Sequence, residues 1–409
     1  MKYKYANYEY KGKYCNNIGD YIQIISIDYL YSVMEVKKED IVYIPLDDLS
    51  VYKGPQVLLP VSMPLVRHCK NGIAGMFSEN ITPVFFGLTM VKESLLECEV
   101  EYLKKYSPIG CRDERTYHTM KKYGIDAYLN GCLTIALPSR KSDNGEFVYF
   151  VDAPEDVKKY IPEGYHHKIK NKTHMYYGNL ENHMSFTRNQ YKEYIDNASL
   201  VVTSLLHCAI PCLAFGIPVI LTKSYVSYRF SWCDKIIKIY TPDKYSTIDW
   251  QPDKIDVKWV KEIITSIFIK RINMDDATVE MQQIHDYYMN RQRCDYIVDG
   301  FISIKKFLSH EWTCKEKIYK YSIWGLTQFA DYTVEYISEN YPNARFQNVY
   351  DVRSDMQFLS KQVLHPDDLV LDDDEYIFVT AIGAVEAARV LLKKKYIQPN
   401  RYCMLERTI

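Results

Sequence analysis

The chain has almost no net charge. Its 51 Lys and Arg residues are balanced by 52 Asp and Glu residues, which leaves a formal charge of -1. Proteins that bind nucleic acid attract phosphates with a concentrated positive field. We interpret two local basic clusters, Lys393–Lys395 and His166–Lys172, as solvated faces. The sequence therefore predicts no nucleic-acid partner.

Long hydrophobic runs are absent as well. No apolar stretch reaches the roughly 18 residues that a membrane-spanning helix needs. The first residues, MKYKYANYEYKGKY, are polar and rich in tyrosine, unlike a secretory signal. We therefore expect a cytoplasmic location, with at most peripheral contact with a membrane.

Regular cysteine spacing is also missing. The 11 cysteines form no CxxC pair, and an odd count argues against a disulfide framework. A reduced compartment fits this pattern better. No spacing of His, Cys or Asp is typical of a metal site. We expect neither a metal ion nor a cofactor.

What is present is an alternation of strand-like and helix-like segments, without internal repeats. This alternation is typical of α/β domains with parallel sheets. A length of 409 residues implies more than one domain. The predicted segments are domains at 1–140 and 141–272, a helical connector at 273–314 and a small Rossmann-like module at 315–409.

Short apolar runs bounded by turn residues predict the strands. They are Asp40–Pro45, Gln56–Val61, Thr82–Leu88, Ala127–Leu129, Leu133–Leu137, Phe147–Val151, Leu200–Val202, Pro218–Leu221, Lys235–Ile239, Ile318–Ile323, Arg345–Tyr350 and Tyr376–Thr380. Helical spacing and cap residues predict the helices. They lie within residues 14–35 and at Lys92–Tyr106, Glu114–Tyr123, Arg188–Asn197, Ala209–Phe215 and Val385–Lys393.

Residues 196–221, DNASLVVTSLLHCAIPCLAFGIPVIL, contain the most informative pattern: strand, turn, short helix, glycine stop, strand. The pattern places His207 near a helix N-terminus, at the carboxyl end of a parallel strand. Open α/β sheets bind ligands in such crevices, and helix N-termini favour anions. A histidine there can be an acid, a base or an anion ligand. The adjacent Thr203 and Ser204 favour this reading over a buried core histidine.

A second cluster, Asn17-Ile18-Gly19-Asp20 followed by Gln23, stands at the start of a predicted helix. A glycine at a helix N-terminus lets backbone N–H groups approach an anion or a sugar. Taken alone, the cluster is better explained as a helix cap, with Asp20 as a favoured capping residue.

A third cluster is Gly110-Cys111-Arg112-Asp113-Glu114-Arg115-Thr116. The pair Arg112 and Asp113 opens a helix after a strand. Such an arginine can bind a phosphate or carboxylate through two hydrogen bonds. A structural salt bridge explains the pair equally well, and the sequence leaves both readings open.

Together these clusters resemble the polysaccharide pyruvyl transferase family over about residues 14–270. The family shows GD-x-x-Q, G-x-R-D-x-x-T and T-S/D-R/S-L/F-H-G elements, in that order. The matching segments are Gly19–Gln23, Gly110–Thr116, Gly131-Cys132, Thr203–Cys208 and Gly216-Ile217-Pro218. The resemblance implies two facing Rossmann-like domains, as in GT-B glycosyltransferases.

The resemblance also implies a reaction. Phosphoenolpyruvate would be the donor and a sugar diol, free or in a lipid-linked oligosaccharide, the acceptor, giving a pyruvate ketal on a surface glycan. His207 suits an acid or base, and Asp20 or Asp113 a base. The substrate-binding candidates are Asn17, Gly19, Gln23, Arg112, Thr116, Thr203, Ser204 and Arg229.

Two positions depart from the family pattern. Leu205 stands where many members have Arg or Ser, and Cys208 where they have Gly. The missing arginine leaves Arg112, Arg115, Arg188 or Arg229 to bind the donor. Two alternatives stay open: a GT-B glycosyltransferase that uses a nucleotide sugar, and a non-catalytic scaffold in glycan assembly. The oligomeric state is open too, with a homo-oligomer as one option.

The C-terminal module contains Gly325-x-Thr327-x-x-Ala330, a Rossmann fingerprint whose middle glycine is replaced. That glycine normally lets the backbone approach a pyrophosphate. Asp351, at the end of the second strand, could hold a ribose or cap a turn. We interpret the module as degenerate, with a role in docking, oligomerisation or regulation.

Overall fold

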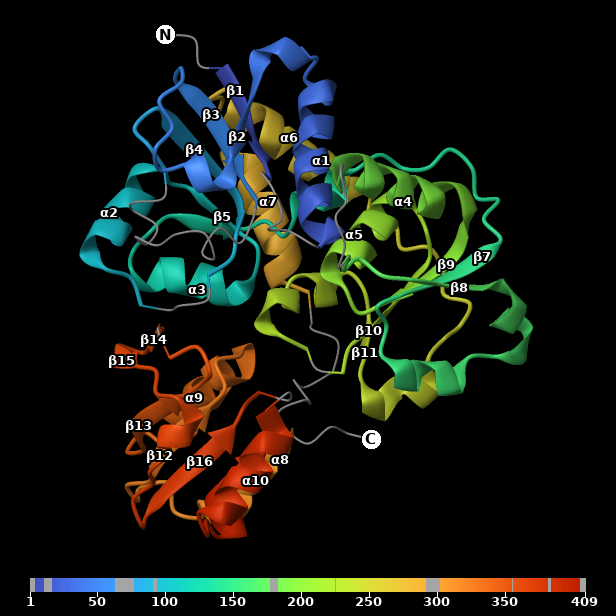
Figure 1. Cartoon of the computed structure of the whole chain (residues 1–409). Helices are drawn as coiled ribbons and strands as arrows, with labels where there is room; N and C mark the ends of the chain where they lie inside the picture. Colours follow the sequence, from blue (N-terminus) through green and yellow to red (C-terminus); the bar gives the residue numbers. More distant parts are fainter. Residues whose placement is uncertain are drawn as a thin grey trace. The chain divides into compact units, whose positions relative to one another are not determined.

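The computed structural model describes residues 4–10, 17–62, 77–90, 94–176, 183–224, 226–291, 302–354, 356–381 and 384–404. The chain forms two compact units. Unit 1 comprises Met1–Lys223 and Tyr228–Tyr296, and unit 2 comprises Ser224–Ser227 and Ile297–Ile409. Unit 1 holds two parallel sheets and unit 2 holds a third (Figure 1). The protein is thus an α/β protein with Rossmann-like domains.

The first sheet of unit 1 is parallel throughout and has the order β2-β1-β3-β4-β5-β6. Its strands are β1 (Lys4–Glu9), β2 (Ile41–Pro45), β3 (Val57–Val61), β4 (Ile81–Leu88), β5 (Ile109–Cys111) and β6 (Ala127–Leu129). The order reverses direction beside β1. Such a switch point opens a crevice at the carboxyl ends of the strands.

Three helices follow strands of this sheet: α1 (Ile18–Val33), α2 (Glu97–Lys105) and α3 (Glu114–Lys122). The first two turns of α1 are buried on nearly every side. A helix that is apolar all round lies inside a protein rather than on its surface. Accordingly, α1 packs against elements of both halves of unit 1 (Figure 1).

The second sheet repeats the same topology with the order β11-β10-β9-β7-β8. Its strands are β7 (Phe147–Val151), β8 (Ile169–Lys172), β9 (Ala198–Thr203), β10 (Val219–Thr222) and β11 (Ile239–Tyr240). The helices α4 (His183–Asn197) and α5 (Leu206–Phe215) flank β9 along the chain. Gly216, with φ of 77°, ends α5 in the left-handed conformation that favours glycine.

After the second sheet the chain returns to the first. Helix α6 (Lys258–Ile272) packs against α1 and β4, and α7 (Thr278–Met289) packs against β6. Arg271 of α6 fixes this return, because its guanidinium donates hydrogen bonds to the carbonyl oxygens of Phe85 and Pro108. The sequence suggests that the second domain ends at residue 272. The helix that ends there, α6, packs against the first sheet.

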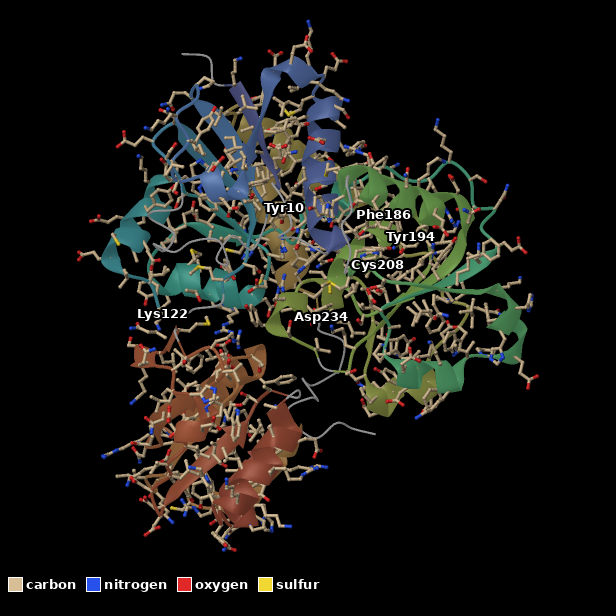
Figure 2. The ribbon with its side chains drawn as sticks, in the orientation of Figure 1. Tyr10, Lys122, Phe186, Tyr194, Cys208 and Asp234 are labelled. Carbon is tan, nitrogen blue, oxygen red and sulfur yellow. The ribbon has the colours of Figure 1, made fainter. Side chains whose placement is uncertain are left out.

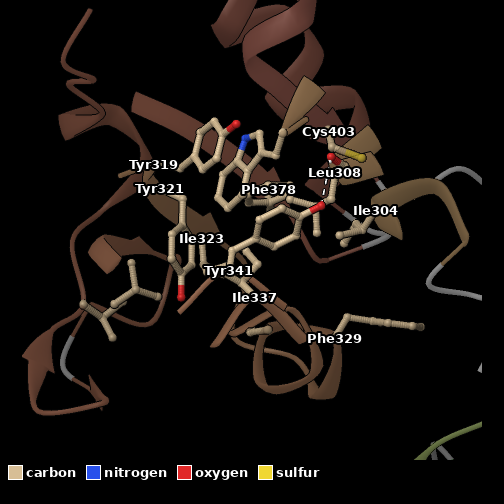
Figure 3. Packing of buried hydrophobic residues seen from close by; sticks show 14 residues of the cluster. Ile304, Leu308, Tyr319, Tyr321, Ile323, Phe329, Ile337, Tyr341, Phe378 and Cys403 are labelled. Carbon is tan, nitrogen blue, oxygen red and sulfur yellow. Dashed lines mark hydrogen bonds between the residues drawn. The ribbon is translucent and has the colours of Figure 1, made fainter. Parts of the chain in front are cut away.

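Unit 2 has a parallel sheet of order β13-β12-β16-β17 and a separate hairpin. Its elements are α8 (Ile302–Glu311), β12 (Lys320–Trp324), α9 (Gln328–Asn340), β13 (Arg345–Tyr350), β14 (Gln357–Phe358), β15 (Lys361–Gln362), β16 (Glu375–Val379), α10 (Val385–Lys394) and β17 (Tyr402–Met404). Aromatic rings dominate its core. The rings of Trp312 and Tyr319 stack at 4.3 Å, and the Tyr341 hydroxyl donates to the Leu308 carbonyl (Figure 3).

Most predicted elements are confirmed within about three residues, but two strand predictions are wrong and two helices begin elsewhere than predicted. One of these helices is α4, which begins at His183 rather than at Arg188. Leu133–Leu137 forms a 3-10 turn, η5 (Leu133–Ala136), packed against α1, α5 and α6, because a short buried apolar run has no strand-specific signal. The strand predicted at Lys235–Ile239 is largely absent. Lys235 is the last residue of another 3-10 turn, and only Ile239 belongs to β11. The helix predicted from Lys92 begins at Glu97, where the Glu99 side chain accepts a hydrogen bond from the Leu96 N–H.

None of the helices in the described ranges combines the length and the apolar character required to cross a bilayer.

Candidate functional site

Two of the three sequence clusters meet in space through Arg112 and His207. Arg112 directly follows β5 of the first sheet, and His207 lies in the first turn of α5, after β9 of the second sheet. The Nη1 atom of Arg112 is 3.5 Å from Nε2 of His207. The carboxyl ends of strands from both sheets therefore contribute to one buried polar site.

The turn before α5 is built by Thr203 and Ser204. The Thr203 hydroxyl donates to the Val151 carbonyl at 2.8 Å and accepts from the Leu205 N–H at 3.1 Å. The Ser204 hydroxyl donates to the Asp152 carbonyl at 2.6 Å. Both hydroxyls thus shape the strand-to-helix turn.

The N-terminus of α5 has no side-chain cap, because its N-cap residue is Leu205. Helix N-termini carry a partial positive charge and unsatisfied N–H groups. The uncapped end therefore favours an anionic ligand. Figure 2 marks Cys208, the residue after His207, in the first turn of this helix.

His207 is buried and neutral. Burial lowers its pKa well below the ordinary value, and the positive charges of Arg112 and Arg229 and the His174 ring lower it further. Because a guanidinium only donates hydrogen bonds, Nε2 of His207 faces Arg112 as an acceptor and the ring proton belongs on Nδ1. The Sγ atom of Cys132 lies 3.8 Å from the same nitrogen.

The Asp113 carboxylate is close enough for the Arg112 charge to oppose the rise that burial causes in its pKa, but Arg112 itself is fully buried and donates hydrogen bonds to neutral acceptors. Its Nη2 donates to Oε1 of Gln23 at 2.7 Å and to the Ser62 carbonyl. Its Nε is buried without a hydrogen-bond partner among the described residues. Buried charges are normally paired with an opposite charge. The site therefore holds a positive charge that an anion would compensate.

The N-terminus of α1 lies at the same site. Asn17 caps the helix by accepting from the Gly19 N–H at 2.9 Å, so the alternative that Asp20 is the cap is wrong. Asp20 lies in the first helical turn instead. A Cβ on Gly19 would stand 3.0 Å from Cβ of His207, and glycine thus allows α1 and α5 to approach closely.

The structure gives Asp113 and Thr116 structural contacts. Asp113 caps α3: one oxygen accepts from the Thr116 N–H at 2.8 Å and the other from the Thr89 hydroxyl. Burial raises the pKa of Asp113, although these hydrogen bonds and Arg112 oppose the rise. The Thr116 hydroxyl accepts from the Met90 N–H. Their geometry fits support of the Arg112 loop.

The other candidate arginines differ in where they lie. Arg229, in η8 (Tyr228–Phe230), is near enough to lower the pKa of His207. Arg188 pairs instead with Asp28 at 3.3 Å. The guanidinium of Arg115 lies over the Tyr228 ring.

Sequence reasoning missed Ser62, Cys132 as a neighbour of His207, and Lys223. Lys223 directly follows β10, and a cation just after a parallel strand was the available signal. Its Nζ donates to the Ser204 carbonyl at 3.0 Å. No group of three or more His, Cys, Asp or Glu side chains in the described ranges is arranged to hold a metal ion.

The comparisons with known proteins identify the family. The family model described as polysaccharide pyruvyl transferase matches residues 17–224, just over half of the chain. No curated protein matches the chain. The matched range starts at Asn17, the cap of α1, and includes Arg112, His207 and Lys223. The chain therefore belongs to the polysaccharide pyruvyl transferase family, a family of transferases.

Proposed function

We propose that this protein transfers a pyruvyl group from phosphoenolpyruvate to a sugar diol, forming a ketal in surface glycan biosynthesis. One observation carries the proposal: the buried Arg112 guanidinium donates to the neutral Gln23 and Ser62 acceptors and lies beside His207. An anionic donor would supply an acceptor of opposite charge to the Arg112 guanidinium. The acceptor would be a sugar or a lipid-linked oligosaccharide.

The donor's charges suit the site. Phosphoenolpyruvate carries a phosphate, which is close to dianionic at pH 7, and a carboxylate. Arg112, Arg229 and the N-terminus of α5 offer cationic or partly positive groups for them. Gln23 and Ser62 hold the Arg112 guanidinium in place.

His207 would act as the acid that starts the reaction. The bound anion offsets the charges of Arg112 and Arg229, so the pKa of His207 rises and the ring gains a proton. Transfer of that proton to the methylene carbon gives a methyl group and an electrophilic neighbouring carbon. One sugar hydroxyl attacks that carbon and phosphate leaves with the electrons of its C–O bond. The second hydroxyl then closes the ketal, and the two hydroxyls release their protons.

A carboxylate must accept a proton from an attacking hydroxyl. Asp113 already uses both oxygens in capping α3 and in binding Thr89. Asp20, in the first turn of α1, is the better candidate. We therefore propose Asp20 as the base and Asp113 as a support of the Arg112 loop.

The test is ligand binding followed by a reaction assay. Calorimetric titration with phosphoenolpyruvate should show binding to the wild-type protein and none to the His207→Ala, Arg112→Met double variant. Cells that carry only His207→Ala should lose pyruvate ketals from their surface glycans. Binding of a nucleotide sugar but not of phosphoenolpyruvate would favour the glycosyltransferase alternative. Unchanged pyruvylation in the His207→Ala cells would refute the catalytic assignment.

A further inference from the structure

Lys223 lies beside the turn that precedes α5. It directly follows β10, the neighbour of β9 in the second sheet. Its Nζ donates a hydrogen bond to the Ser204 carbonyl at 3.0 Å, one residue before the uncapped position Leu205. The ammonium group is thus anchored next to the helix N-terminus.

Arg229 is a second cation that affects Lys223 and His207. Burial, and then the positive charge of Arg229, lower the pKa of Lys223 to about 8, while the Cys233 thiol has the opposite effect. Arg229 also lowers the pKa of His207, so one guanidinium lies within electrostatic reach of both groups. Residues with strongly perturbed pKa values are concentrated at functional sites, because binding and catalysis use groups of this kind.

We propose that Lys223 is a further donor-binding residue, which holds an anionic group of the donor together with the N-terminus of α5. This inference rests on the proposed function. With Arg112 and Arg229, Lys223 brings three cationic side chains to a donor that carries about three negative charges. Leu205, at the N-cap position, contributes no charge, and the Lys223 ammonium supplies one beside it.

The first experiment measures the dissociation constant of phosphoenolpyruvate by calorimetric titration at pH 7. Lys223→Met should raise it about tenfold to hundredfold, since a hydrogen bond to a charged group is lost. Leu205→Arg, added to the Lys223→Met protein, places a positive charge at the N-cap of α5. This second change should restore most of the affinity.

The chain offers a matched control in Lys261. Its Nζ also donates to a backbone carbonyl at an end of α5, that of Ala214 at 2.8 Å, but in the last turn of the helix. Burial lowers its pKa as well. Lys261→Met should leave the dissociation constant within about twofold of the wild-type value, because that end carries a negative dipole and binds no anion.

A pH series gives an independent readout that survives if Lys223→Met fails to fold. Between pH 7 and pH 9 Lys223 loses its proton, and this loss alone should lower wild-type affinity about tenfold while the phosphate charge stays constant. Lys223→Arg keeps its charge throughout this range. Its affinity should therefore fall about tenfold less than that of the wild type, and the fall that remains reflects the proton taken up by His207 on binding.

The outcomes separate the two proposals. If wild-type protein does not bind phosphoenolpyruvate, both the function and the role of Lys223 are overturned. If wild-type protein binds it, and Lys223→Met or Lys223→Arg shows the same affinity and pH profile, only the role of Lys223 is overturned.

Discussion

At the scale of single residues, the site is defined by a buried arginine whose hydrogen-bond acceptors are neutral and by a histidine beside it. Arg112 makes hydrogen bonds to neutral groups, and His207 is kept neutral by burial and by the nearby guanidinium groups. Both conditions cost stability in the free protein. Both would be relieved by an anion, and this gives two predictions.

The first prediction concerns Arg112→Met. Replacement of a buried charge by an apolar side chain is often neutral or stabilising, while Gln23 and Ser62 lose a donor. We expect the free energy of unfolding to change by less than about 2 kcal/mol, but the thermal stabilisation by phosphoenolpyruvate to vanish. Thermal unfolding with and without the donor measures both effects.

Arg271→Met is the control for this variant. Arg271 also donates to backbone carbonyls of the first sheet region, those of Phe85 and Pro108, but it holds α6 in place. We expect lower stability with an intact response to the donor. A large loss of stability in Arg112→Met, with the donor response retained, would show that Arg112 is structural.

The second prediction concerns acid stability. The pKa of His207 is lowered in the folded state, so below about pH 6.5 the unfolded chain binds a proton there that the folded chain does not. This contribution lowers stability as the pH falls, by up to about 1.4 kcal/mol per pH unit. His207→Gln removes it. Urea unfolding between pH 5 and pH 7 should therefore give a shallower slope for the variant; parallel slopes would contradict the prediction.

At the scale of elements, caps and turns hold the site residues. Asp113 caps α3 and thereby fixes the chain next to Arg112, while Thr203 and Ser204 fix the turn before His207. These residues belong to the motifs that resemble the family. Their hydrogen bonds hold the backbone that carries Arg112 and His207.

A third prediction separates a cap from a base. Asparagine caps helices about as well as aspartate, so Asp113→Asn should keep both stability and pyruvyl transfer, whereas Asp113→Ala should lose about 1–2 kcal/mol of stability. Urea unfolding and ketal formation are measured on both variants. A folded Asp113→Asn protein without activity would restore Asp113 as a catalytic base.

The sequence predicts the strands that combine a β-branched or aromatic run with flanking turns, as in Arg345–Tyr350, which forms β13 as predicted. It does not predict β1, β8 or β17, whose residues are largely polar or lie near a chain end. It does not predict η5, because its burial depends on three distant helices. Among the site residues, local motifs identify Arg112 and His207. Ser62 acts through a contact with Arg112, 50 positions along the chain, and no local pattern marks such a contact. Lys223 is marked only by its place directly after β10.

At the scale of the whole molecule, the chain consists of two units with separate cores. Unit 2 has its own parallel sheet and an aromatic core around Trp312. In the loop between β12 and α9, the polar groups bond to residues of unit 2 itself. Thr327 caps α9, and Asp351 accepts hydrogen bonds from the Leu326 N–H and from Arg353. The reading of Asp351 as a turn cap accounts for these contacts.

The fourth prediction follows from the separate cores. Domains with their own cores can unfold separately, so calorimetry of the full chain should show two transitions. Addition of phosphoenolpyruvate should raise only the transition temperature of unit 1, because a ligand that binds the folded state stabilises the unit to which it binds. A single transition that shifts as a whole would show that the two units unfold together.

The contacts of Arg112 have a consequence for how the protein is made. Its guanidinium meets Gln23, Ser62 and His207, which are 89, 50 and 95 positions away along the chain. Gln23 and Ser62 can meet Arg112 once the first sheet has left the ribosome, but His207 can join them only after the second sheet has been released. A nascent chain carrying only the first sheet has no assembled site, and separately produced halves of unit 1 would be inert until they associate.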